Sequence, residues 1–201
     1  MPDLDDELMQ QCQQGNMEAF DLIVRRNQVL LVNFIARFLG DQDSAEDLAQ
    51  ETFVRMFKAI NRYKSGAAKF STWMYHIASN LCKNELRNRG RRGRFFVDSV
   101  ATESSSGPEP TEEDLIATAP AHVSLQPPNQ LEQKERERAV QNAISELPER
   151  YRLPLILRDL QELSYEEISE MLTLPLGTTK SRINRARLML KDKLRSFVES
   201  S

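Results

Sequence analysis

Apolar residues recur at intervals of three and four over two long parts of the chain, residues 4 to 92 and 131 to 198, which is the spacing of one helix face. No stretch shows the alternation of a convincing strand, and no segment repeats. The first part predicts about four helices. We place them from the first residues to about Gln14, from near Met17 to Gly40, from Asp41–Ser44 to about Ile60, and from a cap at Ser71 or Thr72 onward. The chain is therefore predicted to be all-α.

The apolar stripes of these helices are expected to form core. On the second helix they comprise Phe20, Ile23, Val24, Leu31, Phe34, Ile35 and Phe38. On the third they comprise Ala45, Leu48, Ala49, Phe53, Met56, Phe57 and Ile60, and on the fourth Trp73, Met74, Ile77, Ala78, Leu81 and Leu86.

A stretch of different composition separates the two helical parts. Residues 93 to 130 are rich in glycine, proline, serine and acidic side chains. Such a composition predicts a flexible acidic linker, which as a random coil would span roughly 35 Å. The expected organisation is two small helical domains, residues 1–92 and 131–201, joined by this linker.

Composition excludes several classes of function. The 201 residues carry a net charge of only −3, so the distribution of charge matters more than its sum. Cys12 and Cys82 are far apart, and His76 and His122 are isolated, so neither a disulfide framework nor a zinc site is expected. No cofactor or small-molecule substrate is indicated. No apolar run is long enough for a membrane span and the acidic start lacks the features of a signal peptide, so we expect a cytoplasmic protein without membrane insertion.

The outer face of the fourth helix is polar and basic. His76, Asn80, Lys83, Asn84 and Arg87 share one side, and a run of arginines continues to residue 94. Amides and cations on one helix face suit contacts to phosphates and base edges, although an ordinary solvated face accounts for the charges equally well.

The segment before this helix, Tyr63 to Phe70, combines two lysines with two aromatic rings. Aromatic rings beside cations can stack unpaired bases and hold a single strand. The evidence is weak by itself, because Tyr63 and Phe70 can equally be core residues.

The third helix concentrates acids in its first turns and bases in its last. This order suits the helix dipole, and the surplus of acids leaves room for a basic protein partner. A calcium loop counted from Asp41 would need Gly at its sixth position and Glu at its twelfth, where Glu46 and Thr52 stand. No metal site is therefore predicted.

The second domain contains the pattern of a helix-turn-helix motif. Ser164 and Glu167 form a capping box for a short helix, residues 174 to 177 make a turn, and Thr178 is expected to cap a second helix to about Arg195. Pro154 predicts a kink or a fresh helix start. The second helix is strongly basic, and residues near its start could reach bases or phosphates in a major groove: Lys180, Ser181, Asn184 and Arg185.

Three segments together resemble the extracytoplasmic-function (ECF) sigma factors of bacterial RNA polymerase. They are DSAEDLAQETFVRMFKAI (43 to 60), FSTWMYHIASNLCKNELRNRGRR (70 to 92), and LPERYRLPLILRDLQELSYEEISEML (147 to 172) followed by LPLGTTKSRINRARLMLKDKL (174 to 194). The resemblance covers nearly the whole chain except the linker. It implies a non-enzymatic factor whose partners are core RNA polymerase, promoter DNA and an anti-sigma factor.

The resemblance also implies site residues. The polymerase would bind Asp47, Gln50, Glu51 and Val54. The minus-ten element, with a base flipped out, would contact Tyr63, Phe70, His76, Asn80, Lys83, Asn84 and Arg87. The minus-thirty-five element would contact Thr178, Lys180, Ser181, Arg182, Asn184 and Arg185.

The sequence departs from the family pattern in three places. Thr179 replaces an apolar β-branched residue, so looser packing under the second helix of the helix-turn-helix motif is expected. Gln161-Glu162 stands where a glycine usually precedes the Leu-Ser pair, so that turn is expected to be built differently. The linker is long for the family.

Parts of the sequence also fit two other classes of function. Residues 164 to 195 alone also fit a conventional regulator that acts without core polymerase, but the first domain shows no signature of a ligand pocket. A nuclease that uses the acids of residues 41 to 51 is disfavoured, because those acids crowd one helix start.

Overall fold

The computed structural model describes residues 4–66, 68–100 and 128–198, and within them all regular structure is helical. The helices are α1 (Leu4–Gln13), α2 (Met17–Leu39), α3 (Gln42–Lys58), the 3-10 turn η1 (Ile60–Arg62), α4 (Phe70–Val100), α5 (Pro128–Ser145), α6 (Glu149–Asp159), α7 (Tyr165–Leu172) and α8 (Leu176–Val198). The prediction of an all-α protein is confirmed for these residues. None of their helices is both long and apolar enough to cross a lipid bilayer.

Several helix ends lie where the sequence predicts them. Gly40 ends α2 with φ +75°, and its amide donates to Ala36 O. Such a left-handed conformation is one that glycine adopts without steric cost. At α7 the capping box is complete, because Glu167 N donates to Ser164 Oγ at 3.1 Å and Ser164 N donates to Glu167 Oε2 at 2.7 Å.

Other helix boundaries differ from the predictions. Helix α4 begins at Phe70, so Ser71 and Thr72 lie inside its first turn and do not cap it. Thr173 takes a left-handed conformation (φ 53°) at the end of α7. Helix α8 starts at Leu176, so Thr178 lies inside its first turn and does not cap it. Helix α6 starts at Glu149 and runs through Pro154, which therefore does not begin a new helix.

The expected linker is shorter than its composition suggests. Helix α4 continues past Arg92 to Val100, and α5 begins at Pro128. Residues 101–127, the remainder of the predicted linker, lie outside the described residues.

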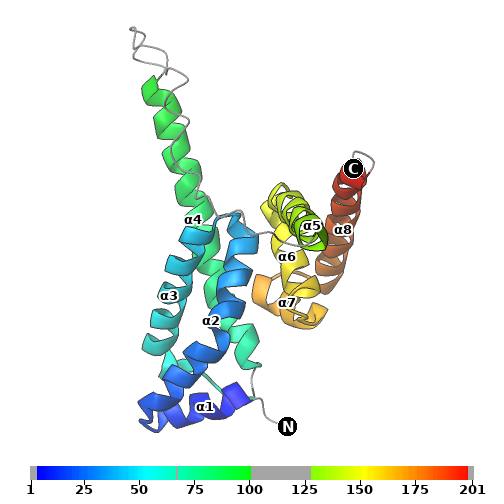
Figure 1. Ribbon diagram of the computed structural model, residues 1–201. Helices are drawn as coiled ribbons and strands as arrows, with labels where there is room; N and C mark the ends of the chain where they lie inside the picture. Colours follow the sequence, from blue (N-terminus) through cyan, green and yellow to red (C-terminus); the bar gives the residue numbers. More distant parts are fainter. Residues whose placement is uncertain (1–3, 67, 101–127, 199–201) are drawn as a thin grey trace.

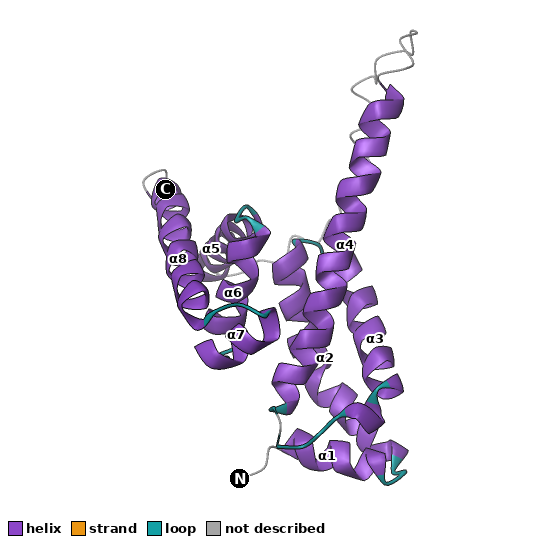
Figure 2. Ribbon diagram, turned by 180° about the vertical axis from the view of Figure 1, so that it is seen from behind, coloured by secondary structure: helices purple, strands orange, loops and turns teal. Residues whose placement is uncertain are grey.

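The first domain is a helical bundle in which α2, α3 and α4 lie side by side and α1 crosses one end (Figure 1). The second domain packs α8 against α5, α6 and α7, with α8 on the side away from the first domain (Figure 2). The predicted stripes form the core of the bundle; Phe34, Phe38 and Phe70 are fully buried. Phe57 is the exception, since it is 47% exposed; its ring packs edge to face with that of Phe20.

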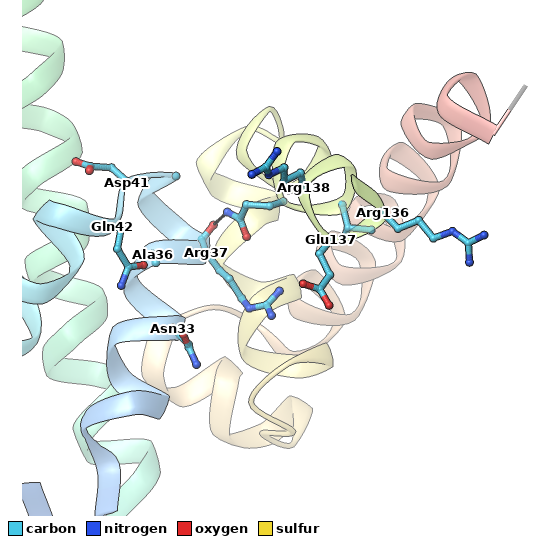
Figure 3. Close-up of a pocket in the computed structure, with 11 residues that line it drawn as sticks. Asn33, Ala36, Arg37, Asp41, Gln42, Arg136, Glu137 and Arg138 are labelled. Carbon is cyan, nitrogen blue, oxygen red and sulfur yellow. Dashed lines mark hydrogen bonds between the residues drawn. The ribbon is translucent and has the colours of Figure 1, made fainter. Parts of the chain in front are cut away.

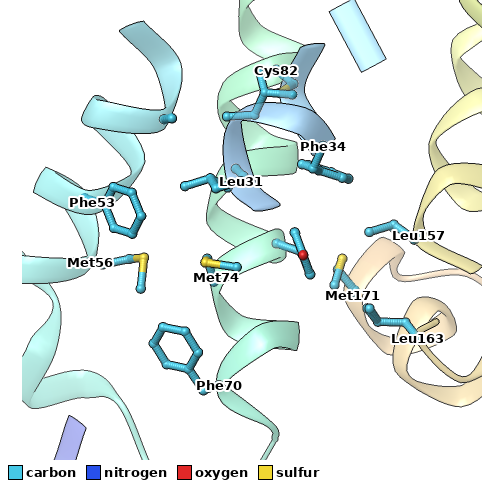
Figure 4. Packing of buried hydrophobic residues seen from close by; sticks show 14 of the residues in the cluster. Leu31, Phe34, Phe53, Met56, Phe70, Met74, Cys82, Leu157, Leu163 and Met171 are labelled. Atoms are coloured by element: carbon cyan, nitrogen blue, oxygen red, sulfur yellow. The ribbon is translucent and has the colours of Figure 1, made fainter. Parts of the chain in front are cut away.

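The two domains pack against each other. One buried cluster continues from Phe34 and Met74 in the first domain to Leu157, Leu163 and Met171 in the second (Figure 4). The expected picture of two domains joined only by a linker is therefore incomplete. Helix α4 contributes Tyr75, which is 4% exposed and lies outside its predicted stripe, with its ring 4.9 Å from that of Phe34.

Hydrogen bonds frame this interdomain contact at two places. Near α7, Thr72 Oγ1 donates to Glu167 Oε1 at 3.1 Å, Lys69 Nζ lies 3.4 Å from the same carboxylate oxygen, and the Tyr75 hydroxyl donates to Gln161 Oε1. At the end of α2, Gln141 and Arg152 donate to backbone carbonyls of the first domain.

A groove of about 760 Å³ opens beside the second of these places. Asn33, Arg37 and Gln42 line it from the first domain, and Arg136, Glu137 and Gln141 line it from α5 (Figure 3). The groove is thus shared by both domains.

Candidate nucleic-acid and protein interfaces

The predicted polar face of α4 is on the surface. His76, Asn80, Asn84 and Arg87 are exposed, and Lys83 is half-buried at the border with the second domain. The His76 ring nitrogen Nε2 lies 3.5 Å from Asn80 Nδ2. Partial desolvation by neighbouring groups, and secondarily the charge of Lys83, lowers the pKa of His76, which favours a neutral ring that can accept or donate hydrogen bonds.

The ammonium group of Lys83 interacts electrostatically with charged groups of both domains. Its pKa is lowered by burial and, to a lesser extent, by Arg87, while Glu149 of the second domain acts in the opposite direction. A cation that already interacts with a carboxylate across the domain border is a poorer phosphate ligand than an exposed one, as long as the domains stay together.

The segment before α4 exposes its cations and buries its rings. Tyr63 and Phe70 are 5% and 0% exposed, and the Tyr63 ring lies 5.1 Å from Trp73 and 6.4 Å from Phe70. Lys64, Ser65, Gly66, Ala68 and Lys69 face solvent, and Gly66 has φ +85°. Tyr63 and Phe70 are therefore core residues, which is one of the two alternatives that the sequence left open, and they hold the two ends of the segment. A nucleic acid could reach the exposed backbone and lysines between them.

The basic run after Arg87 is partly structural. Arg89 Nη2 donates to Asp41 Oδ2 at 2.7 Å and to Ser44 Oγ at 2.6 Å, and its Nε donates to Glu85 at 3.1 Å. A hydrogen bond from Ser44 and then the contacts of Arg89 lower the pKa of Asp41. Arg89 therefore joins α4 to the start of α3, which sequence counting could not distinguish from a phosphate contact.

The start of α8 presents the predicted minus-thirty-five residues together. Lys180, Ser181, Asn184 and Arg185 are exposed, while Thr178 and Arg182 are half-buried beside them. The underside consists of Ile183 and Ala186, both with no exposure, and of Thr179. The Thr179 hydroxyl donates to Pro175 O at 3.3 Å, so the polar group that this departure from the family pattern introduces is hydrogen-bonded.

Not every cation of α8 is available to a ligand. Arg187 pairs with Asp159, with Nε 2.9 Å from Oδ2, and Lys193 pairs with Glu146. These two residues attach α8 to the rest of its domain. The predicted contact residues lie in the first half of the helix.

Arg150 is a residue that the sequence analysis missed. It lies over the Tyr151 ring at 4.8 Å and shares a pocket of about 320 Å³ with residues from α8. Those residues are Thr178, Ser181, Arg182 and Arg185. The fold adds a cation from the start of α6 to the basic surface of α8; the basic LPERYR segment was the only sequence signal for it.

A third surface lies on α3 and the adjacent side of α2. Asp47, Gln50 and Val54 are exposed on one face, and Glu51 receives a hydrogen bond of 2.7 Å from Arg55. Gln50 also lines a groove of about 400 Å³ between α2 and α3. Val29, which is 68% exposed, lines the same groove and was not predicted from the sequence.

The turn before α7 is built with a strained residue. Glu162 stands where the family pattern has glycine, and it adopts φ +57°. The turn therefore keeps a left-handed conformation without glycine, at a cost of roughly 1–2 kcal/mol.

No group of His, Cys, Asp and Glu among the described residues could hold a metal ion.

The comparisons with known proteins agree with this geometry. Residues 23–92 match the model of Sigma-70 region 2, and residues 137–190 match that of Sigma-70, region 4. The chain is 33% identical to the ECF RNA polymerase sigma-E factor of Haemophilus influenzae, over 96% of this chain and 97% of the relative. It is 36% identical to the RNA polymerase sigma-H factor of Pseudomonas aeruginosa, over 91% and 90% of the two chains.

Solved structures share the fold. CnrH, in complex with the cytosolic domain of CnrY, superposes with a TM-score of 0.66 at 21% identity and covers 96% of this chain and 99% of its own. The sigma factor RpoE of Bartonella quintana, in complex with the anti-sigma factor NepR, has a TM-score of 0.63 at 22% identity and covers 88% and 96% of the two chains.

Proposed function

The chain belongs to the ECF sigma factors of RNA polymerase, and from this membership we propose that its three exposed surfaces divide the work of promoter-specific transcription initiation. This family is non-enzymatic, so these surfaces bind and position partners while the polymerase forms the bonds. The observation that carries the proposal is the chemistry of these surfaces: α3 exposes acids beside an apolar groove, whereas α4 and α8 each expose amides beside cations.

The α3 surface is proposed to bind core polymerase. It combines exposed acids with an apolar groove, through Asp47, Gln50, Val54 and Val29. A partner with cations around an apolar ridge would match it, because apolar contact supplies affinity and the charges supply specificity. Glu51 would take part through its pair with Arg55.

The α4 surface is proposed to contact minus-ten DNA. Asn80 and Asn84 can form hydrogen bonds with base edges, and Arg87, Lys64 and Lys69 can approach phosphates. Extrusion of a base costs a few kcal/mol, so the exposed segment before α4 must provide contacts that offset it. Tyr63 and Phe70 are proposed to act by fixing the ends of that segment.

The α8 surface is proposed to read minus-thirty-five DNA in the major groove. Lys180, Ser181, Asn184 and Arg185 lie at the exposed start of the second helix of a helix-turn-helix, as groove readers do. Arg182 and Thr178 flank them, and Arg150 adds a phosphate contact from α6.

An anti-sigma factor is proposed as a further partner. The Bartonella quintana protein that shares this fold was solved with one. In this chain the groove of Figure 3 is shared by both domains, so one regulator bound there could hold them together.

Transcription in vitro tests the proposal directly. Core polymerase is given a pool of promoter fragments with and without this chain, and we expect transcripts from a defined subset only when the chain is present. Arg138→Ala, which changes an exposed arginine of α5 outside the α3, α4 and α8 surfaces, serves as the matched control for Arg185→Ala. Tight duplex binding without polymerase and no chain-dependent transcripts would contradict the proposal.

A further inference from the structure

The segment proposed to contact minus-ten DNA is attached at its first residue to α1, a helix outside the matched region 2. That match begins at residue 23, whereas α1 spans Leu4–Gln13. The attachment uses side chains of α1 that are separated from their partners by about fifty positions of sequence. We propose that Asp6 and Gln13, the α1 anchor, are positioning residues for the minus-ten segment.

Gln13 holds the backbone of the turn that leads into the segment. Its Nε2 donates to Ile60 O at 2.9 Å and to Tyr63 O at 2.8 Å. Ile60 begins η1 and Tyr63 follows its end, so one amide group connects both ends of the turn to α1. Both donated hydrogens are used, and a glutamate at this position would have none to offer.

Asp6 holds the side chain at the same point. The Tyr63 hydroxyl donates to Asp6 Oδ1, and this carboxylate is only 9% exposed. Because the Tyr63 ring also packs on Trp73 of α4, Tyr63 is fixed by α1 at its hydroxyl and by α4 at its ring. The exposed residues Lys64, Ser65 and Gly66 therefore start from a point that is defined relative to α4, the helix that carries Asn80.

Helix α1 is itself held firmly on α2. Arg26 Nε donates to Asp5 Oδ1 at 2.9 Å, and the buried Asn27 donates from Nδ2 to Asp5 Oδ2 at 3.1 Å and to Ile23 O at 3.0 Å. Met9 and Cys12 are buried beneath the helix. The α1 anchor thus fixes the start of the segment relative to the bundle. A segment that is already ordered loses less conformational entropy when it binds DNA.

This inference rests on the proposed minus-ten role of the segment, and the test separates the two. The full chain in complex with core polymerase is titrated with a single-stranded oligonucleotide that carries the minus-ten sequence recovered from the transcript pool. The variants are Gln13→Glu, Tyr63→Phe, Asp6→Ala and Asp6→Asn. The control is Gln10→Glu, which makes the same charge change at an exposed position of α1.

We expect Gln13→Glu, Tyr63→Phe and Asp6→Ala each to weaken oligonucleotide binding by roughly three- to tenfold, as loss of one or two hydrogen bonds allows. Asp6→Asn should restore most of the loss, since its amide oxygen still accepts from the Tyr63 hydroxyl. Affinity for core polymerase and for minus-thirty-five duplex should stay unchanged in all variants. A purely structural role would instead lower all three affinities together.

Two results would overturn the inference. One is unchanged oligonucleotide binding by the anchor variants while Asn80→Ala and Lys64→Ala still weaken it, which would leave the proposed function intact. The other is an equal loss in Gln10→Glu. If Asn80→Ala and Lys64→Ala also bind normally, the minus-ten role of the segment is wrong, and the anchor has no DNA function to support.

Discussion

The α8 surface and the α4 surface are both proposed to face DNA, yet they are assembled in different ways. The α8 residues lie on one helix whose underside is sealed by Ile183 and Ala186, and the pairs of Arg187 and Lys193 stay within their own domain. The α4 surface combines a helix face with a segment anchored by Tyr63, and it borders α7 through Thr72. A self-contained surface should respond to local changes only, whereas a composite surface should respond to changes made elsewhere.

The largest expected effect tests the local character of α8. Arg185→Ala should weaken use of specific promoters by about 1–3 kcal/mol if the guanidinium makes a bidentate contact with a base. Because α8 is self-contained, binding of the minus-ten oligonucleotide should not change. Transcription titrations on promoters with and without a minus-thirty-five element measure both. An equal loss on every sequence would reduce Arg185 to a phosphate contact.

A smaller effect tests whether α4 responds to the second domain. Tyr75→Phe keeps the buried ring and removes the hydrogen bond to Gln161, which should weaken the interdomain contact by about 0.5–1.5 kcal/mol. We expect this variant to bind the minus-ten oligonucleotide more tightly, because α7 then covers the edge of the α4 surface less of the time. Gln161→Ala removes the same bond from the other domain and should act alike. If both variants bind as the parent chain does, the α4 surface is independent of α7.

Glu162→Gly changes the turn before α7 and is expected to stabilise the protein, whereas Tyr75→Phe weakens a contact. Relief of the left-handed strain, partly offset by the greater freedom of glycine in the unfolded chain, should stabilise the second domain by about 0.5–1 kcal/mol. Chemical denaturation measures the gain. Duplex binding through α8 should remain the same, and a destabilised variant would show that the Glu162 side chain has a role in the fold.

The smallest effect concerns the pH dependence of α7. Burial opposes ionisation of Glu167, but hydrogen bonds from Ser164 and Thr72 and the charge of Lys69 lower its pKa overall. Its contribution to stability is therefore present above the ordinary glutamate pKa and is lost as the pH falls through the lowered value. Hydrogen exchange should show earlier loss of protection in α7 than in α8 on acidification, and Glu167→Gln should remove the difference.

The sequence predicted those parts of the fold that depend on local chemistry. Gly40 and the Ser164–Glu167 box end and begin helices through contacts within a few residues, so their patterns were sufficient. Thr173 and Glu162 could not be predicted in the same way, because both adopt a positive φ that is unfavourable for residues other than glycine. Pro154 likewise lies inside α6, where tertiary contacts outweigh its tendency to interrupt a helix.

The candidate sites show the same contrast between features set by local sequence and features set by contacts between distant segments. Exposure of Asn80, Asn84 and Arg185 followed from helical periodicity. The partners of Arg89 and Arg187, the proximity of Arg150 to α8, and the burial of Tyr63 all depend on contacts between distant segments. Charge patterns therefore predicted the three surfaces but did not separate the exposed cations from those that hold helices together.

The interdomain contact has one further consequence, which concerns how such domains can be exchanged. Gln141 and Arg152 donate to Arg37 O and Phe38 O at 3.2 and 2.7 Å, carbonyls of the last turn of α2 that have no partner within the helix. Every residue type supplies a backbone carbonyl, so these two hydrogen bonds do not depend on the side chains of the first domain. The Thr72–Glu167 and Tyr75–Gln161 bonds do depend on it. A chimera that joins this second domain to a relative's first domain would keep the two bonds to backbone carbonyls and lose the two between side chains, unless positions 72, 75, 161 and 167 are transferred together.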